Sequence, residues 1–314
     1  MTVAVRDSVL WVRPDSQSAL QVPLWATSNP VGSAIMAELA KTPTAVWLTG
    51  SSTGSSVADR LNLAAGRLVT FVAYNAPLRD LGSYSAGGAA SETAYRAWVD
   101  AHAAWIQGRL CEIVLDPDAL AMADRMTDPS KLAERIRCLN YAIDAYTAAG
   151  AAVLLDVGDS GWFPAGRRDE MADLAVEAGV ARAAGIVSNV SHFRWTRDED
   201  AFCTELLALI AERAEGTDAL QYAIDVSRNG TGPVARLPGQ AAEHSWCNPD
   251  PCGFGALPTS KRSVRYYPRC RGLRHVKHIG SDGERDGAPE AGRPYPTNAV
   301  RMYHRARPAR AIVW

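Results

Sequence analysis

The sequence has no excess of charge of either sign. Its 33 Lys and Arg are offset by 34 Asp and Glu, which gives a formal net charge of −1. Proteins that bind nucleic acid or anionic membrane surfaces concentrate positive charge, so neither is indicated as a partner. No apolar run approaches the roughly 18 residues that a membrane-spanning helix needs. Residues 1–7 contain no long apolar core of a secretory signal peptide, so no such signal is visible.

Cysteine and phosphate-loop patterns are also absent. The six cysteines are too few and too scattered for a small disulfide scaffold, and none forms a Cys-x-x-Cys pair. A zinc site at His244, Cys247 and Cys252 is not favoured, because neither the spacing nor a fourth ligand fits. The Gly/Ser run 50–56 lacks the Gly-Lys-Ser/Thr of a nucleotide-binding loop, so it is interpreted as a turn and helix cap. Segment 158–161 does not have the Gly-x-Ser-x-Gly spacing of a serine hydrolase.

The chain does have enough apolar sequence for one large core. It is 314 residues long and 47% hydrophobic, and α/β barrels of this size often form a single domain. We therefore treat 1–314 as one domain with an irregular lead-in at 1–25. Apolar runs alternate with helical periodicity, which is typical of an α/β fold built from βα units. The predicted strands are 45–48, 68–74, 113–115, 152–156, 185–189 and 222–225. The predicted helices are 33–39, 92–106, 131–146, 169–178 and 199–213.

The alternation breaks down after Pro258. A seventh strand is expected there, and 272–277 is a poor match because residues 261–278 are rich in Lys and Arg. We expect the register of 258–283 to be disturbed and predict no structure for it. Helical periodicity returns only at 299–303.

Aspartates follow four predicted strands on the same side of the sheet: Asp80, Asp118, Asp156 and Asp225. Any one of them could be a turn or helix-cap residue. Four at one rim are harder to explain by capping, because carboxylates brought together raise one another's pKa. Active sites use this effect to keep one carboxyl protonated near neutral pH, and glycoside hydrolysis needs such an acid. Asp118, which follows the strand 113–115 and Pro117, is our candidate.

Six segments, in order, resemble the signatures of the family six glycoside hydrolases, the inverting cellulases. The first runs from Tyr74 to Asp80 and continues from Tyr84 to Gly88. The second, 116–120, is similar to the signature Glu-Pro-Asp-Ser-Leu. The others are 155–162, 188–191, 224–230 and 246–248. One match would be weak, but six in the family's order extend the resemblance from Trp11 to the C-terminus.

The resemblance implies a distorted, TIM-barrel-like α/β barrel of about seven parallel strands, with its active site at the C-terminal ends of the strands. It also implies hydrolysis of β-1,4-glucan with inversion, without a metal or cofactor. Asp118 would be the general acid, and Asp80 would hold Asp118 protonated and order a chain of waters. Tyr74 would press the central sugar away from its relaxed ring shape. Ser85 would lie on a mobile loop that holds the attacking water.

Other matching positions would contact the substrate. Trp47, Trp162 and Trp246 match ring platforms at successive subsites, and Asn189 matches an amide that binds sugar hydroxyls. Arg228 would balance the charge of the clustered carboxylates, since its planar guanidinium suits carboxylate pairing.

The sequence departs from the family pattern at three places. Asp159 stands where the family has a substrate-binding histidine, which alters that contact and adds negative charge near the acid. Leu81 replaces a cysteine, so Cys138 is expected to lack its disulfide partner. The segment 277–283 resembles Lys-Pro-x-Gly-Glu-Ser-Asp-Gly but lacks the glutamate and is one residue shorter. Lys277 there would bind sugar, and Asp282 would be the candidate base.

Loop lengths distinguish internal from terminal cleavage. The connection 282–295 is short and the loop after Asp80 is compact, whereas exo-acting members need longer loops to enclose a tunnel. We therefore expect an open cleft and an endo-β-1,4-glucanase. We also expect a monomer, and the resemblance implies a place outside the cell or at its envelope. Two alternatives are a cellobiohydrolase and a catalytically impaired glycan-binding protein, the latter suggested by Asp159 and by the altered segment 260–282.

Overall fold

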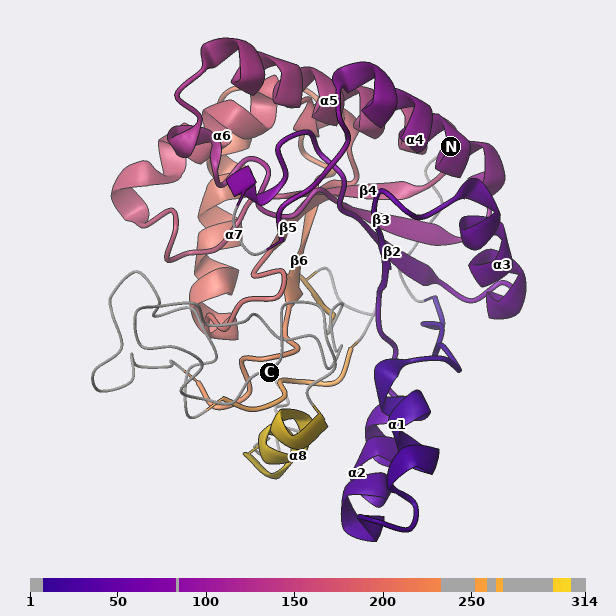
Figure 1. Cartoon of the computed structure of the whole chain (residues 1–314). Helices are drawn as coiled ribbons and strands as arrows, with labels where there is room; N and C mark the ends of the chain where they lie inside the picture. Colours follow the sequence, from indigo (N-terminus) through magenta and orange to yellow (C-terminus); the bar gives the residue numbers. More distant parts are fainter. Residues whose placement is uncertain (1–7, 83–84, 233–251, 259–263, 268–295, 306–314) are drawn as a thin grey trace.

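Seven parallel strands form the centre of the molecule. The computed structural model describes residues 8–82, 85–232, 252–258, 264–267 and 296–305. The strands form one sheet in chain order, and every neighbouring pair is parallel (Figure 1). They are β1 (Val46–Leu48), β2 (Val69–Ala73), β3 (Cys111–Leu115), β4 (Ala152–Asp156), β5 (Gly185–Ser188), β6 (Gln221–Asp225) and β7 (Val264–Tyr267). The predicted α/β class with parallel strands is confirmed. Within the described ranges, no pairing between β1 and β7 closes the sheet.

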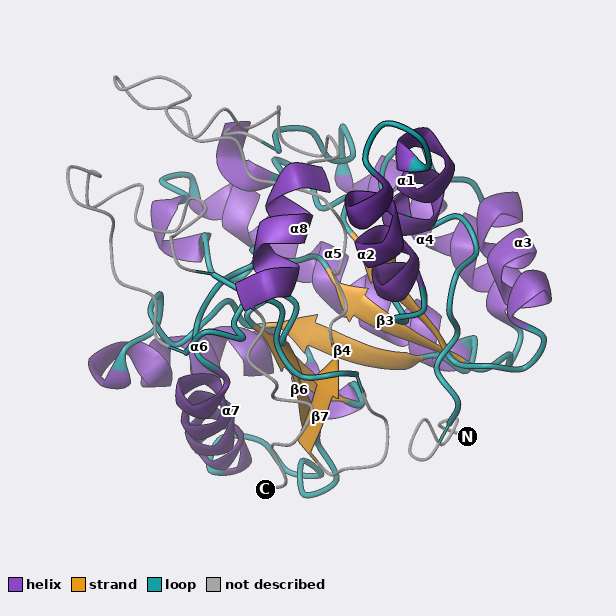
Figure 2. Ribbon diagram, turned by 90° about the horizontal axis from the view of Figure 1, so that it is seen from below, coloured by secondary structure: helices purple, strands orange, loops and turns teal. Residues whose placement is uncertain are grey.

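A helix connects each strand to the next from β1 to β6. These helices are α3 (Gly54–Ala64), α4 (Glu92–Ile106), α5 (Pro129–Ala148), α6 (Arg168–Glu177) and α7 (Thr196–Ala211). They cover one face of the sheet, whereas α1 (Gln17–Trp25), α2 (Pro30–Ala40) and α8 (Pro296–Arg305) lie apart from them (Figures 1 and 2). Among the described residues, no helix combines the length and the hydrophobicity needed to cross a membrane.

Strands β2 to β5 are buried on both faces. Alternate side chains point to opposite sides of a strand. One set packs against the covering helices in the main core, and the other set forms a separate cluster that includes Val72, Val114, Leu154 and Val187. Such strands appear in sequence as continuous apolar runs. This is why β2, β3 and β4 were predicted within one or two residues of their ends.

Side-chain caps fix where the helices begin. The Oγ of Ser91 accepts the N–H of Ala94 at the start of α4, and the carboxylate of Asp128 accepts the N–H of Ser130 at the start of α5. The hydroxyl of Thr53 caps α3 in the same way. The interpretation of 50–56 as a turn and helix cap is therefore confirmed.

The prediction of an irregular lead-in over 1–25 is wrong for its second half. Helix α1 begins after Ser16, whose Oγ accepts the N–H of Ala19, and it contains Pro23 near its C-terminal end. A proline inside a helix normally argues against one. Here α1 packs along α2, and this tertiary contact stabilises a helix that local propensity does not favour.

The seventh strand also differs from its prediction. It lies at Val264–Tyr267 and pairs with β6, Tyr222 opposite Val264. The predicted position, 272–277, falls outside the described residues. Helix α8 extends the predicted 299–303 in both directions and packs against α2, where Met36 and Met302 share a small apolar core.

Candidate active site

The turn after β3 places Asp116 and Asp118 in different surroundings. Asp116 and Asp118 both have positive φ, 39° and 70°, a conformation that is uncommon outside glycine. Asp116 is buried: its Oδ1 accepts the N–H groups of Asn75 and Ala76, both at 2.7 Å, and its Oδ2 accepts the hydroxyl of Tyr95. Asp116 therefore anchors this turn to the end of β2.

Asp118 is partly exposed: 22% of its side chain is accessible to solvent. Its backbone N–H donates to Oδ1 of Asp156 at 3.0 Å. Burial raises the pKa of Asp118 to about 6, against the opposing charge of His192 and with the help of Asp80 and Asp159. A carboxyl with this pKa is still partly protonated in mildly acidic to neutral solution, which is what general acid catalysis requires.

Asp156, at the end of β4, is buried directly behind Asp118. Its Oδ1 accepts the N–H groups of Asp118 and Gly158, both at 3.0 Å, and no donor among the described residues reaches its Oδ2. Burial and the nearby charge of Asp118 raise the pKa of Asp156 well above its ordinary value. Through its hydrogen bond to the N–H of Asp118, Asp156 fixes the backbone of Asp118.

Asp80 holds the loop that follows β2. Its Oδ2 accepts the N–H of Ser85 at 2.6 Å, and burial raises the pKa of Asp80 above its ordinary value. Arg79 ties the same loop together by donating to the carbonyl oxygens of Tyr74, Ser85 and Ala86 at 2.8, 2.8 and 3.1 Å. Asp80 and Ser85 are thus brought together, as the sequence predicts.

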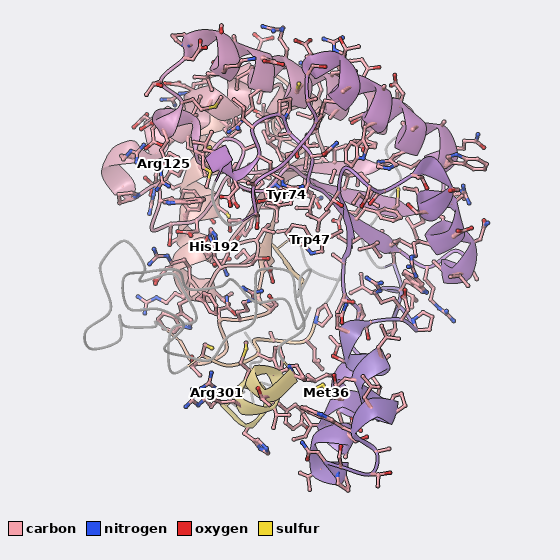
Figure 3. The ribbon with its side chains drawn as sticks, viewed as in Figure 1. Met36, Trp47, Tyr74, Arg125, His192 and Arg301 are labelled. Carbon is pink, nitrogen blue, oxygen red and sulfur yellow. The ribbon has the colours of Figure 1, made fainter. Side chains whose placement is uncertain are left out.

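Tyr74 lies between this loop and β1. Its ring meets that of Trp47 edge to face at 5.3 Å, and the guanidinium of Arg79 lies 4.6 Å from its ring centre. Burial, together with the charges of Asp118 and Asp80, raises the pKa of Tyr74 well above its ordinary value. Trp47 also lines a cavity of about 240 Å³. Figure 3 shows Tyr74, Trp47 and His192 between the sheet and the contact of α2 with α8.

Asp159 forms an ion pair that sequence reasoning missed. Only 7% of its side chain is exposed, and its Oδ2 accepts the Nδ1–H of His192 at 2.6 Å. Its Oδ1 accepts from Arg194 Nε at 3.1 Å. The hydrogen bond and charge of His192, with Arg194, outweigh burial and hold the pKa of Asp159 below its ordinary range. Its Oδ1 also accepts the N–H groups of Gly161 and Trp162 at 2.7 and 3.0 Å, so Asp159 is held by its own loop as well as by His192.

His192 comes from the loop after β5 and reaches the acid. Its Nε2 lies 4.0 Å from Oδ1 of Asp118, and its ring meets that of Trp162 edge to face at 5.2 Å. Burial by itself would lower the pKa of His192, but Asp159, Asp118 and Asp156 raise it to about 9. A signal for this residue in the sequence is that a titratable ring directly follows the fourth family-like segment, 188–191.

Asn189 does not offer its amide to a ligand in this structure. The residue is fully buried with φ 62°. Its Nδ2 donates to the carbonyl oxygens of Asp225 and Arg194, and its Oδ1 accepts the N–H of Arg194. The expectation of a hydroxyl-binding amide gives way to that of a side chain that shapes the loop carrying His192.

Asp225 and Arg228 hold the same loop from β6. Asp225 accepts the N–H groups of Ser191 and Ser227 at 2.9 and 2.8 Å. This aspartate at the end of β6 therefore holds the loop after β5 in place. Arg228 donates to the carbonyl oxygen of Ser191 at 2.8 Å and lies over the ring of Phe193. His192 and Arg125 are cations whose charge lowers the pKa of Asp118, and the charge-balancing role of Arg228 stays a prediction.

Of the remaining predicted site residues, one lies within the described part of the chain and three do not. Trp162 lies beside His192, and the guanidinium of Arg125 lies 5.9 Å from its ring centre. Trp246, Lys277 and Asp282 fall outside the described residues. In the described ranges no group of three His, Cys, Asp or Glu side chains is arranged to hold a metal ion, and Cys138 is a buried free cysteine.

The arrangement defines a class: a parallel α/β protein with an acidic cluster at the C-terminal ends of its strands, one carboxyl of which has a pKa suited to proton transfer. Comparison with known proteins then gives the family. The model of the family "Glycosyl hydrolases family 6" matches residues 5–306. The chain belongs to this glycoside hydrolase family, as the six segments predict.

Its relatives include several bacterial endoglucanases. Endoglucanase A of Thermobispora bispora is 34% identical over 265 residues, which are 81% of this chain and 54% of that protein. Endoglucanase 1 of Streptomyces sp. (strain KSM-9) is 35% identical over 253 residues, 76% of this chain and 65% of that protein. The chain thus spans between about half and two-thirds of the length of these relatives.

A solved structure matches nearly the whole chain. The endoglucanase Cel6 from Mycobacterium tuberculosis, solved in complex with methyl-cellobiosyl-4-deoxy-4-thio-β-D-cellobioside, superposes with a TM-score of 0.82 at 32% identity. The match covers 97% of this chain and 99% of that one.

Proposed function

We propose that this protein is an inverting endo-β-1,4-glucanase in which Asp118 is the general acid. The observation that carries the proposal is the Asp118 carboxyl itself. It is held at the C-terminal end of β3, it is partly exposed, and its pKa is raised to about 6. In an inverting enzyme the acid protonates the leaving oxygen while a base activates water on the opposite face of the sugar.

The described residues supply one side of this reaction. Asp118 gives its proton to the glycosidic oxygen, and the negative charge of Asp80 delays the loss of that proton. Tyr74 and Trp47 form an apolar wall against which a sugar ring can be held. Ser85, whose N–H is bound by Asp80, is placed to order the attacking water. We assign the base to Asp282 and further sugar contacts to Trp162, Trp246 and Lys277, on the resemblance alone.

Internal cleavage is supported by the relatives and by the loop after β2. The relatives described above are named endoglucanases. The side chain of Arg79 binds the carbonyl oxygens of Ser85 and Ala86, and its backbone N–H donates to the carbonyl oxygen of Gly87 at 3.1 Å, so these described ends of the loop are held close together. A compact loop leaves a cleft open to the middle of a chain. Because the substrate is a polymer that lies outside cells, we place the protein there or at the cell envelope.

The first test is Asp118→Asn. The amide cannot donate a proton to the leaving oxygen in the same way, so kcat on cello-oligosaccharides should fall by about 10²- to 10⁴-fold, while oligosaccharide affinity measured by calorimetry stays within a few-fold. Asp144→Asn removes a remote carboxylate paired with Arg182 and serves as the control, with kcat unchanged. Retention of wild-type kcat in Asp118→Asn would refute the assignment.

The same enzyme preparation separates the alternatives. An endoglucanase lowers the viscosity of soluble substituted cellulose long before much reducing sugar appears, whereas a cellobiohydrolase releases sugar with little loss of viscosity. Binding of cello-oligosaccharides without any release of reducing sugar would establish the glycan-binding alternative. Proton NMR of the first product should show the α-anomer if the reaction inverts.

A further inference from the structure

We propose that His192 is a positioning residue for Asp118: the Asp159 carboxylate clamps its ring, and its Nε2 faces the Asp118 carboxyl across the site. The proposal rests on the function proposed above. It gives Asp159, which stands where a histidine is expected by resemblance, a defined role. With Asp159 at that position, the imidazole in the site is that of His192, which comes from the loop after β5.

The geometry leaves His192 little freedom. Its Nδ1–H donates to Asp159 at 2.6 Å, and the edge of its ring lies against Trp162. Only 19% of its side chain is exposed. With Nδ1 held and the ring in contact with Trp162, Nε2 lies 4.0 Å from Oδ1 of Asp118. A bound histidine nitrogen fixes the orientation of the other one, as in many catalytic sites.

The loop below His192 is built to keep this arrangement. Asn189 has three hydrogen bonds to backbone atoms of the loop and of β6. Asp225 holds the N–H of Ser191, and Arg228 holds its carbonyl oxygen. The backbone on the N-terminal side of His192 is thus bound from three side chains, which is more support than a surface loop needs.

The charges around the ring are unbalanced without His192. Asp159 faces it from the loop after β4, Asp118 from the turn after β3 and Asp156 from the end of β4, while Arg194 approaches Asp159 from the histidine's own loop. Asp156 is buried, and burial together with the charge of Asp118 raises its pKa well above its ordinary value. A cationic His192 therefore cancels the charge that Asp159 adds, so the acid titrates as if the pair were nearly neutral. The proton on the ring stays there; it is not transferred during catalysis.

The test compares the basic limb of the pH profile of kcat/KM in a double-mutant cycle. His192→Gln removes a positive charge beside Asp118 and leaves Asp159 paired with Arg194, so Asp118 should keep its proton longer and the limb should move up by about one pH unit or more. Asp159→Asn removes a negative charge and should move the limb down. The double variant should lie between the two and close to wild type. Asp144→Asn is the control and should leave the limb in place.

An independent readout does not need activity. Ring nitrogen-15 NMR, with the signal assigned by its absence from His192→Gln, should show His192 protonated past pH 7 in the wild type. In Asp159→Asn its midpoint should fall by at least one unit. A wild-type midpoint near 6.5, or a limb that does not move in His192→Gln while KM rises, would overturn the proposal, since His192 would then be a plain substrate contact or a structural residue. If no glucan is cleaved, the proposed function fails while the NMR result still decides the state of His192.

Discussion

Asp116 and Asp118 stand two residues apart, yet their surroundings give them different tasks. Asp116 is surrounded by three donors and has no exposed oxygen, whereas Asp118 has few donors and faces an opening. A carboxylate that accepts several hydrogen bonds is a structural anchor, and one short of donors holds its proton more easily. The difference in donors, rather than the residue type, separates the anchor from the acid.

The anchoring role of Asp116 predicts a stability loss in Tyr95→Phe. The substitution removes the hydroxyl that donates to a fully buried oxygen, and leaving that oxygen without its donor should lower the free energy of unfolding by about 1–3 kcal/mol. Tyr141→Phe removes an exposed hydroxyl bound to Asp100 and should cost no more than about 0.5 kcal/mol. Urea unfolding of both variants measures the difference. Equal losses would show that Asp116 does not depend on Tyr95.

Replacing Asp80 should shift the pH profile of kcat/KM. Its negative charge raises the pKa of Asp118, so Asp80→Asn should let Asp118 ionise earlier and should move the basic limb of kcat/KM to lower pH. The control is again the remote Asp144→Asn. A limb that stays in place while kcat falls would mean that Asp80 acts through the Ser85 loop alone.

At the scale of elements, one side chain of α5 connects two loops of the site. Arg135 is buried, and it donates to the carbonyl oxygens of Ala119, Pro77 and Leu78 at 3.0, 3.0 and 2.7 Å. Ala119 follows the acid and Leu78 precedes Asp80. The relative position of the two carboxylates is therefore set partly from a helix on the outer face.

Arg135→Met should damage both stability and catalysis. Buried carbonyl oxygens lose their donors, which should cost about 3 kcal/mol of unfolding free energy. The two loops should also shift, lowering kcat by about 10- to 100-fold. Arg137→Met, on the exposed face of the same helix, removes an exposed ion pair with Glu92 and should leave both the free energy of unfolding and kcat nearly unchanged. Unchanged kcat in a folded Arg135→Met protein would contradict the coupling.

At the scale of the whole molecule, the site sets how stability depends on pH. Burial raises the pKa of Asp118 to about 6 and that of Glu199, which holds Ser160, to about 7. The partners of His192 raise its pKa to about 9. A group whose pKa is raised on folding binds its proton more tightly in the folded state, so stability falls as the pH rises from its unfolded to its folded pKa.

The melting temperature should therefore fall as pH rises from about 4 to about 9, where these three groups titrate in turn. Below about pH 4 it should fall again, because the lowered pKa of Asp159 marks a carboxylate whose stabilising contacts are lost on protonation. Asp118→Asn should flatten the decline between about pH 4 and 6. Calorimetry across this range measures it, and a melting temperature that rises from pH 5 to 9 would contradict the scheme.

The sequence by itself determined strands β1 to β6, helices α2 and α4 to α7 and the family of the chain, and it named Asp80, Asp118 and Tyr74 as candidate site residues. Parallel strands that are buried on both faces appear in the sequence as continuous apolar runs. The short segments that follow them carry the resemblance to the family. The helix α1 was missed because its proline is tolerated only through packing on α2. The strand β7 was missed because a basic segment hides four residues that pair with β6.

Only the tertiary structure decided which polar groups meet. The contact of Asp159 with His192 joins loops after β4 and β5, and it reverses the expected role of Asp159 from a sugar contact to a clamp. The burial of Asn189 and the choice between Asp116 and Asp118 depend in the same way on neighbours distant in the chain. Residue types and spacing can name candidate acids, but pKa values and hydrogen-bond partners arise from charges and donors that folding brings together.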